Sequence, residues 1–240
     1  LPTSSSHALI GGLVGAGLAH QGMDVIRWGK VVATVKWIPL APLLGLVLGF
    51  FIMVAVFWLF RKFRPGAVDQ FFRKGQLVSA ALYSLGHGGN DAQKTMGIIM
   101  VLLVASGHLG SETKLSLMEW KTAWIILSCH LAMAIGTAMG GWRIVKTMGM
   151  KITKLKPVGG FCAETAGAAT LFAATHLGIP VSTTHTITGA IVGVGSTTKF
   201  STIKWGIARS IVWAWIVTIP FSALAAAICF YAFKAFHPGL

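Results

Sequence analysis

The sequence predicts an all-α, polytopic membrane protein, and three observations indicate this fold class. Of its 240 residues, 55% are hydrophobic and only 11% are charged, whereas roughly 25% of residues are charged in soluble globular proteins. The mean hydropathy of the chain is +0.74. Charge-free runs occur at 37–60, 122–142 and 210–233, and each is long enough for a transmembrane helix, which takes about 20 residues.

Other classes of apolar segment do not fit these runs. A signal peptide occurs once, at the start of a chain, whereas the runs recur along this one. An amphipathic surface helix keeps one polar face, and the strands of a membrane β-barrel alternate over about 10 residues. We therefore expect a multi-pass protein of the cell membrane, in contact with lipid. Its short basic loops favour a bacterial inner membrane.

The net charge of +14 is explained by the loops. The 20 Lys and Arg residues cluster between the apolar runs, as expected for loops on the cytoplasmic side of a membrane. A nucleic-acid-binding surface would interleave basic and aromatic residues on one face, and the sequence has no such pattern. We therefore expect no nucleic-acid partner.

An internal repeat joins the start of the chain to a later segment. "LPTSSSHALIGGLVGAG" (1–17) aligns without gaps to "IPVSTTHTITGAIVGVG" (179–195), and "IRWGK" (26–30) matches "IKWGI" (203–207). A proline, a serine, a histidine and three glycines coincide in register, and chance does not explain this run. The coinciding pairs are Pro2 and Pro180, Ser4 and Ser182, His7 and His185, Gly11 and Gly189, Gly15 and Gly193, and Gly17 and Gly195.

The chain opens inside one copy of this repeat. The second copy is preceded by a long region that contains "GHGGNDAQK" (86–94). We therefore expect that the chain is a fragment, and that a corresponding Asn-Asp segment precedes the first copy.

Loop charges predict how the apolar runs cross the membrane. Residues 61–74 contain five basic residues and one acid, and residues 143–156 contain five basic residues and no acid. Residues 107–120 contain two acids and one lysine. If 75–106 and 121–142 each cross once, the loops alternate between the two sides, and 61–74 and 143–156 are cytoplasmic.

Residues 157–198 carry a single charge, Glu164, and are interrupted by glycines and a proline. This pattern predicts two short helical pieces that meet in the membrane, or a re-entrant hairpin. Either adds an even number of membrane crossings, so the total number of crossings between the two repeats is odd. The two repeats then face opposite ways in the membrane, as in many secondary transporters. We expect 1–60 to be the end of the first repeat with a connecting helix, 61–74 a cytoplasmic loop, and 75–240 the second repeat.

The segment "GHGGNDAQKTMG" (86–97) places polar residues at membrane depth. A charge at the bilayer centre costs at least about 2.5 kcal/mol, so Asp91 is expected to contact a substrate or coupling ion. The three glycines predict a broken helix that restarts near Asn90, with its positive end toward an anion or with Asn90 as a structural cap. Lys94 is either a ligand contact or an ion-pair partner of Asp91. Glu164, the second deeply placed acid, is a further candidate for the coupling ion.

Each repeat also carries hydroxyl residues at the three positions directly before its histidine. Hydroxyls can bind an oxyanion or Na⁺ without a permanent charge, and they can also cap a half-helix. The histidine that follows in each copy is a ligand, a proton carrier or a packed core residue. These candidates are Ser4, Ser5, Ser6 and His7 in the first copy, and Ser182, Thr183, Thr184 and His185 in the second.

No motif for an enzyme, cofactor or metal site stands out. The sequence lacks a P-loop, a CxxC pair and a nucleophile elbow. Cys129, Cys162 and Cys229 lie inside apolar segments without paired spacing, and we interpret all three as buried apolar residues.

These segments together resemble the inorganic phosphate transporter (Pit) family over essentially the whole chain. "GHGGNDAQKTMGII", "GGWRIVKTMGMKITKLKPVGGFCAETAGA" and "GIPVSTTHTITGAIVGVG" are similar to motifs of its second half, and "LPTSSSHALIGGLVGA" to the end of its first half. By this resemblance, Asn90 and Asp91 match the second Asn-Asp motif, and Glu164 matches the acid of the "AET" stretch. The serines at 4–6 and the hydroxyls at 182–184 match the family's two hydroxyl motifs.

The resemblance implies an inverted-repeat carrier of inorganic phosphate, coupled to H⁺ or Na⁺, which in some members moves phosphate bound to a divalent metal. Three alternatives remain open at this stage. They are a permease for sulfate or another oxyanion, a non-transporting membrane scaffold or receptor, and an ion channel.

Overall fold

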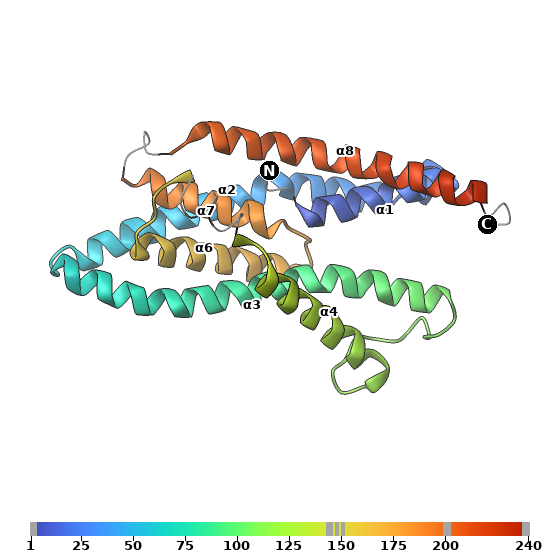
Figure 1. Ribbon diagram of the computed structural model, residues 1–240, viewed down its shortest axis with the longest axis horizontal. Coiled ribbons are helices and arrows are strands. Elements are labelled where there is room, and N and C mark those ends of the chain that lie inside the picture. The colour runs from blue at the N-terminus through green and yellow to red at the C-terminus, as the bar shows by residue number, and fades with distance from the viewer. Residues whose placement is uncertain (1–3, 143–145, 147–148, 150–151, 199–202, 237–240) are drawn as a thin grey trace.

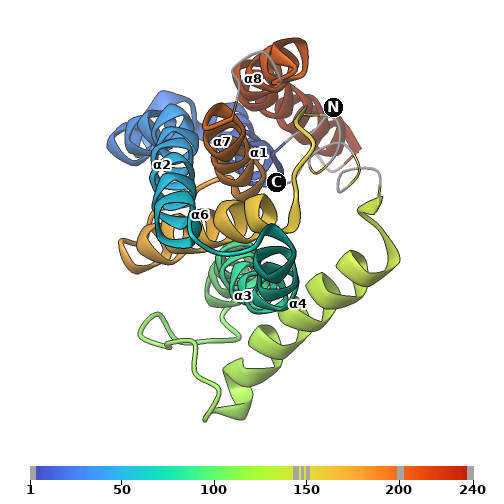
Figure 2. The same ribbon diagram turned by 90° about the vertical axis from the view of Figure 1, so that its left-hand side faces the viewer.

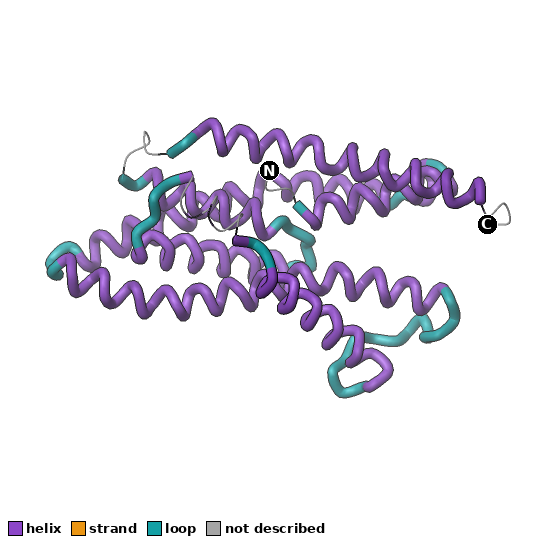
Figure 3. Tube along the Cα trace, in the orientation of Figure 1, coloured by secondary structure: helices purple, strands orange, loops and turns teal. Residues whose placement is uncertain are grey.

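The computed structural model describes residues 4–142, 146, 149, 152–198 and 203–236. Helices joined by short loops make up this part of the chain, which confirms the all-α prediction (Figures 1 and 3). The helices are α1 (Ser5–Gln21), the 3₁₀ turn η1 (Met23–Val25), α2 (Trp28–Phe60), α3 (Pro65–Ala105), α4 (Trp120–Met139), α6 (Pro157–His176), α7 (Thr183–Ser196) and α8 (Trp205–Phe236).

Three segments are long and apolar enough to cross a membrane. They are Trp28–Phe60, Trp120–Met139 and Val212–Phe236, and they overlap the three apolar runs predicted from the sequence. Most of their side chains are exposed on the outer surface of the helix bundle, where a membrane would supply lipid.

Short helices begin halfway along the molecule. α6 runs toward the middle and α7 returns from it, and α1 also starts near the middle, whereas α8 ends at one end of the molecule (Figure 1). Gly178, with φ +66°, turns the chain between α6 and α7. α1 has 17 residues and α7 has 14, so they extend about 25 and 21 Å, less than the roughly 30 Å of a hydrocarbon core. Residues 157–198 contain two helical pieces, as predicted, but only α7 is short, because α6 has 20 residues and extends about 30 Å.

Helix α7 packs on α2 through two glycines of the repeat. A Cβ atom on Gly189 would overlap the carbonyl oxygen of Pro42, and a Cβ on Gly193 would overlap that of Leu46. Such small-residue spacing allows two backbones to come close together.

The same packing recurs between α1 and α8. A Cβ on Gly11 would overlap the Ile219 carbonyl oxygen, and a Cβ on Gly15 would overlap that of Ala223. Gly11 and Gly15 are the repeat equivalents of the two glycines on α7, and Ile219 and Ala223 are the equivalents of their two partners on α2. The short helix of each repeat thus packs on the long helix of the other.

Helix α3 is continuous, and the predicted break at 86–89 is wrong. Its 41 residues extend about 60 Å, with the Asn-Asp segment near the middle. Glycine in a helix interior costs only about 1 kcal/mol, and tertiary contacts offset this cost. Gly86 packs against Leu171 of α6, and Asn90, inside the helix, is not an N-cap.

The start of α3 also corrects the predicted loop at 61–74. Only residues 61–64 form a turn, and Pro65 begins the helix, because proline is favoured in the first turn, where its missing N–H is not needed. Half of the predicted loop 143–156, seven of its fourteen residues, lies outside the described residues. The segment 107–119 is a loop, as predicted.

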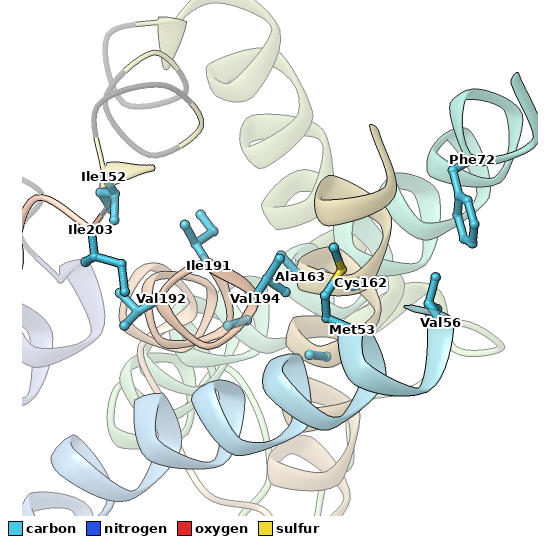
Figure 4. Close-up of a cluster of buried hydrophobic side chains, with 12 residues drawn as sticks. Met53, Val56, Phe72, Ile152, Cys162, Ala163, Ile191, Val192, Val194 and Ile203 are labelled. Atoms are coloured by element: carbon cyan, nitrogen blue, oxygen red, sulfur yellow. The ribbon is translucent and has the colours of Figure 1, made fainter. Parts of the chain in front are cut away.

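A buried apolar cluster holds α2, α3, α6 and α7 together (Figure 4). Met53, Phe72, Cys162 and Ile191 contribute to it from these four helices. Helix α4 instead packs on α3 and projects from the bundle (Figure 2). Cys129 is buried beside α3, whereas Cys229 is exposed, so the prediction that all three cysteines are buried is wrong for Cys229, which lies on the outer face of α8.

Candidate functional site

Two equivalent serines begin the two short helices that start in mid-molecule. The Ser4 side chain accepts a hydrogen bond of 3.2 Å from the backbone N–H of His7, and Ser182 accepts one of 3.4 Å from that of His185. Both serines are therefore N-caps of their helices, α1 and α7. The structural role that the sequence allowed for these hydroxyls is the one observed.

The two helix starts lie against each other. Ser6 Oγ on α1 donates 3.3 Å to the carbonyl oxygen of Val181, just before α7. The rings of His7 and His185 contact edge to face. Amides in the first turn of a helix have no acceptor within that helix, and each start carries a partial positive charge of roughly half a unit. Their convergence creates a site with several N–H donors and positive potential.

Helix α3 brings an ion pair to this point. Lys94 Nζ lies 2.7 Å from Asp91 Oδ1, 2.6 Å from Ser6 Oγ and 2.9 Å from the Val181 carbonyl oxygen. One side chain therefore joins α3, the start of α1 and the loop before α7. Lys94 is the ion-pair partner of Asp91, which was one of the two roles that the sequence left open.

The second oxygen of Asp91 faces α7. Thr183 Oγ1 donates 3.2 Å to Asp91 Oδ2, and His87 Nδ1 lies 3.5 Å from the same oxygen. Because 3.5 Å is long for a hydrogen bond, the histidine makes an electrostatic contact at most. Asp91 is thus held by groups on α3 and α7.

A cavity of about 740 Å³ borders this cluster. Tyr83 and His87 of α3 line one wall, and Thr183 and Thr184 of α7 line another. Gly136 and other residues at the end of α4 complete the lining. The hydroxyl motif of the second repeat is therefore reachable from a cavity large enough for a hydrated oxyanion.

Glu164 lies apart from Asp91. Its carboxylate accepts 2.6 Å from Ser79 Oγ and 3.4 Å from Gln76 Nε2. Ser79 precedes Asp91 by 12 residues on the same helix, a separation of about 18 Å along its axis. A second cavity of about 430 Å³, lined in part by Gln76 and Glu164, lies beside this carboxylate. The structure does not bring the two predicted coupling-ion residues together.

Tyr83 lines both cavities. Its hydroxyl donates 3.2 Å to the Thr183 carbonyl oxygen, and its ring is parallel to that of His87, with centroids 6.2 Å apart. The side chain therefore stands between the space beside Glu164 and the space beside Thr183.

Other predicted residues have different surroundings. Asn90 is buried and donates 3.0 Å to Thr175 Oγ1 at the end of α6, so its amide nitrogen faces α6. Ser5 is exposed. Within the described ranges, no group of three or more His, Cys, Asp or Glu side chains could hold a metal ion.

Sequence reasoning missed several neighbours of the site. His87 precedes Asp91 by four residues and would have been found had 86–97 been interpreted as a continuous helix. Tyr83 belongs to the same helical face. Thr175 on α6 and the partners of Glu164 on α3 left no local signal, since they meet their partners only through tertiary packing.

Comparisons with known proteins agree with this architecture. The model of the Phosphate transporter family matches residues 1–67 and 61–226. A probable low-affinity inorganic phosphate transporter of Rhizobium meliloti (strain 1021) is 58% identical over 232 residues, which cover 97% of this chain and 68% of that protein. One of Bacillus subtilis (strain 168) is 39% identical, over 96% of this chain and 68% of that protein.

A solved structure shares the fold. The sodium-dependent phosphate transporter has a TM-score of 0.81 and 23% sequence identity, over 98% of this chain and 74% of that one. At this identity the likeness shows a shared arrangement of the helices and nothing about the side chains of the site.

Proposed function

This chain belongs to the phosphate transporter family, and on that basis we propose that it carries inorganic phosphate across the membrane by symport with H⁺ or Na⁺. The observation that carries the proposal is the meeting of the α1 and α7 starts beside the Asp91–Lys94 pair. The three apolar spans, with the α6–α7 pair between the second and the third, support a multi-pass arrangement in this proposal.

Phosphate binds, in this proposal, at the two helix starts. The first-turn amides of Ser5, Ser6, Thr183 and Thr184 are oriented as donors, and their partial positive charge favours an anion. Thr184 also lines the larger cavity and offers a hydroxyl to an entering oxyanion. The Ser4 and Ser182 hydroxyls shape the site indirectly, because each caps its own helix.

The two carboxylates take different parts. Asp91 lies in the substrate site, where it balances the charge of Lys94 and accepts a hydrogen bond from Thr183. Glu164 has its own hydrogen bonds and its own cavity, so it exchanges the coupling cation at a distance from phosphate. The histidines His7 and His185 are buried at the contact between the repeats, where they pack the two helix starts together.

Alternating access arises, in this proposal, from a rocking movement of two rigid units against each other, each built from one helix of each repeat. The α1–α8 and α7–α2 pairs are the rigid units, since their backbones are in close contact. The helix starts lie where the two units meet, so a small rotation there would open the site to one side and close it to the other.

Uptake of radiolabelled phosphate into proteoliposomes containing the protein tests the proposal. We expect saturable uptake that depends on a proton or sodium gradient, with competition by arsenate and weak competition by sulfate. Adding and chelating Mg²⁺ shows whether phosphate travels with a divalent metal. Absence of saturable flux under every gradient would reject the transport function and favour a scaffold or receptor.

A further inference from the structure

We propose that the oxygen atoms around Lys94 Nζ form a monovalent-cation site, which the Lys94 ammonium group occupies as a tethered cation in place of a free Na⁺ ion. The role of this site in transport rests on the proposed function. The experiment that tests the site measures ion binding and does not depend on transport. It assigns to Lys94 a role other than contact with phosphate.

The ligand set is that of a cation site. Asp91 contributes a carboxylate oxygen at 2.7 Å, Ser6 a hydroxyl oxygen at 2.6 Å, and Val181 a backbone carbonyl oxygen at 2.9 Å. These oxygens come from α3, α1 and the unwound segment before α7. Transporters coordinate Na⁺ with such mixtures, especially with carbonyls of unwound backbone. A single carboxylate matches the charge of a monovalent ion.

Lys94 satisfies this site completely. An ammonium group has three N–H donors and no acceptor, and the three oxygens use all three donors. The side chains of Lys94 and Asp91 are each only 11% exposed, so water does little to stabilise either charge and the pair must stabilise itself. Direct contact with phosphate would require Lys94 to give up one of these bonds.

The geometry has a consequence for ion coupling. A free cation at Asp91 Oδ1 would have to displace the Lys94 ammonium, whose four-carbon stem keeps it at high local concentration. Free Na⁺ therefore does not enter this site in the unmodified protein. Removing the ammonium leaves a buried carboxylate with one hydroxyl and one carbonyl beside it, and Na⁺ can then bind.

The test is the thermal unfolding of purified protein in NaCl against choline chloride. For Lys94→Ala we expect the midpoint to rise with Na⁺ in a saturable manner, and to rise with ammonium chloride as well, because ammonium replaces the removed group. The unmodified protein lacks this additional rise, whereas any response from the separate Glu164 site is common to both proteins. Binding of radiolabelled sodium should show one additional site in Lys94→Ala.

Three controls separate the site from general salt effects. Lys94→Met keeps the volume of the stem without the charge and should not gain the response. Asp91→Asn combined with Lys94→Ala removes the carboxylate and should abolish the response. Lys36→Ala removes an exposed lysine from α2 and should behave like the unmodified protein.

Equal sodium responses in Lys94→Ala and the unmodified protein would overturn the proposal, as would a folded Lys94→Ala whose midpoint ignores Na⁺. Lys94→Ser serves as a second cavity-creating variant. If both variants remain unfolded even in saturating Na⁺, the proposal is also wrong, since the ion should restore the missing charge. If the unmodified protein shows no phosphate flux, the transport function is rejected. The conclusion about sodium binding at Asp91 does not depend on that result.

Discussion

The rings of His7 and His185 lie edge to face, with centroids 4.7 Å apart and 66° between their planes. These two residues occupy the same position in the two copies of the repeat, so their contact marks where the copies meet. His185 also packs on Trp215, at 4.3 Å between ring centroids. The helix starts that we assign to phosphate therefore rest on a packed aromatic contact between the repeats.

Gly189→Ala should destabilise the protein by about 1 to 3 kcal/mol, because the added methyl group meets the Pro42 backbone and forces α7 away from α2. Gly12→Ala is the matched control on α1. A Cβ there meets nothing within 4 Å, and alanine favours the helix, so stability should stay equal or rise. Unfolding in detergent measures both, and equal losses in the two variants would contradict the packing described here.

Asp91→Asn should reduce phosphate uptake at least about tenfold, which corresponds to roughly 1.4 kcal/mol. The substitution removes the charge that balances Lys94 and weakens the hydrogen bond from Thr183. Initial uptake rates, normalised to the amount of protein in the membrane, measure the effect. Asp69→Asn is the control, because Asp69 pairs with Arg73 on the surface, where ion pairs contribute little. Unchanged uptake by Asp91→Asn would remove Asp91 from the site.

Tyr83→Phe should lower the phosphate uptake rate several-fold while stability falls by only about 1 kcal/mol. The variant keeps the ring but loses the 3.2 Å hydrogen bond to the Thr183 carbonyl oxygen, which positions the start of α7. Tyr231→Phe, on the exposed face of α8, should change neither quantity. A normal uptake rate in Tyr83→Phe would show that this hydrogen bond does not position the site.

The sequence predicts most of the fold, because the features that decide it are local or repeated. Apolar length identifies the spans, and the gapless repeat identifies Ser4 and Ser182 as equivalent residues, which proved to be equivalent caps. The prediction of a break in α3 is wrong because the low helix propensity of glycine is only a local tendency. Packing of Gly86 against α6 outweighs it.

Parts of the site were beyond prediction because they depend on contacts between distant segments. Ser79 and Glu164 are 85 positions apart, and Lys94 and the Val181 carbonyl are 87 apart. No local pattern indicates such pairs. The sequence indicates both Asp91 and Glu164 as coupling-ion candidates because both are acids at membrane depth. In the structure they lie at different positions along α3, since Glu164 contacts Ser79, 12 residues before Asp91.

Thr184→Cys should react with a small, membrane-impermeant thiol reagent, and phosphate should slow this reaction. Thr184 lines the larger cavity at the start of α7, so the new thiol would face water and could ionise, as modification requires. The native cysteines provide the background: Cys129 and Cys162 are buried, and the exposed Cys229 lies on the apolar outer face of α8, where a membrane would supply lipid. A bound oxyanion at the α7 start would cover the new thiol directly. Thr137→Cys, on the α4 wall of the same cavity, should react with little protection by phosphate. Equal protection at both positions would place phosphate in the open cavity and not at the helix start.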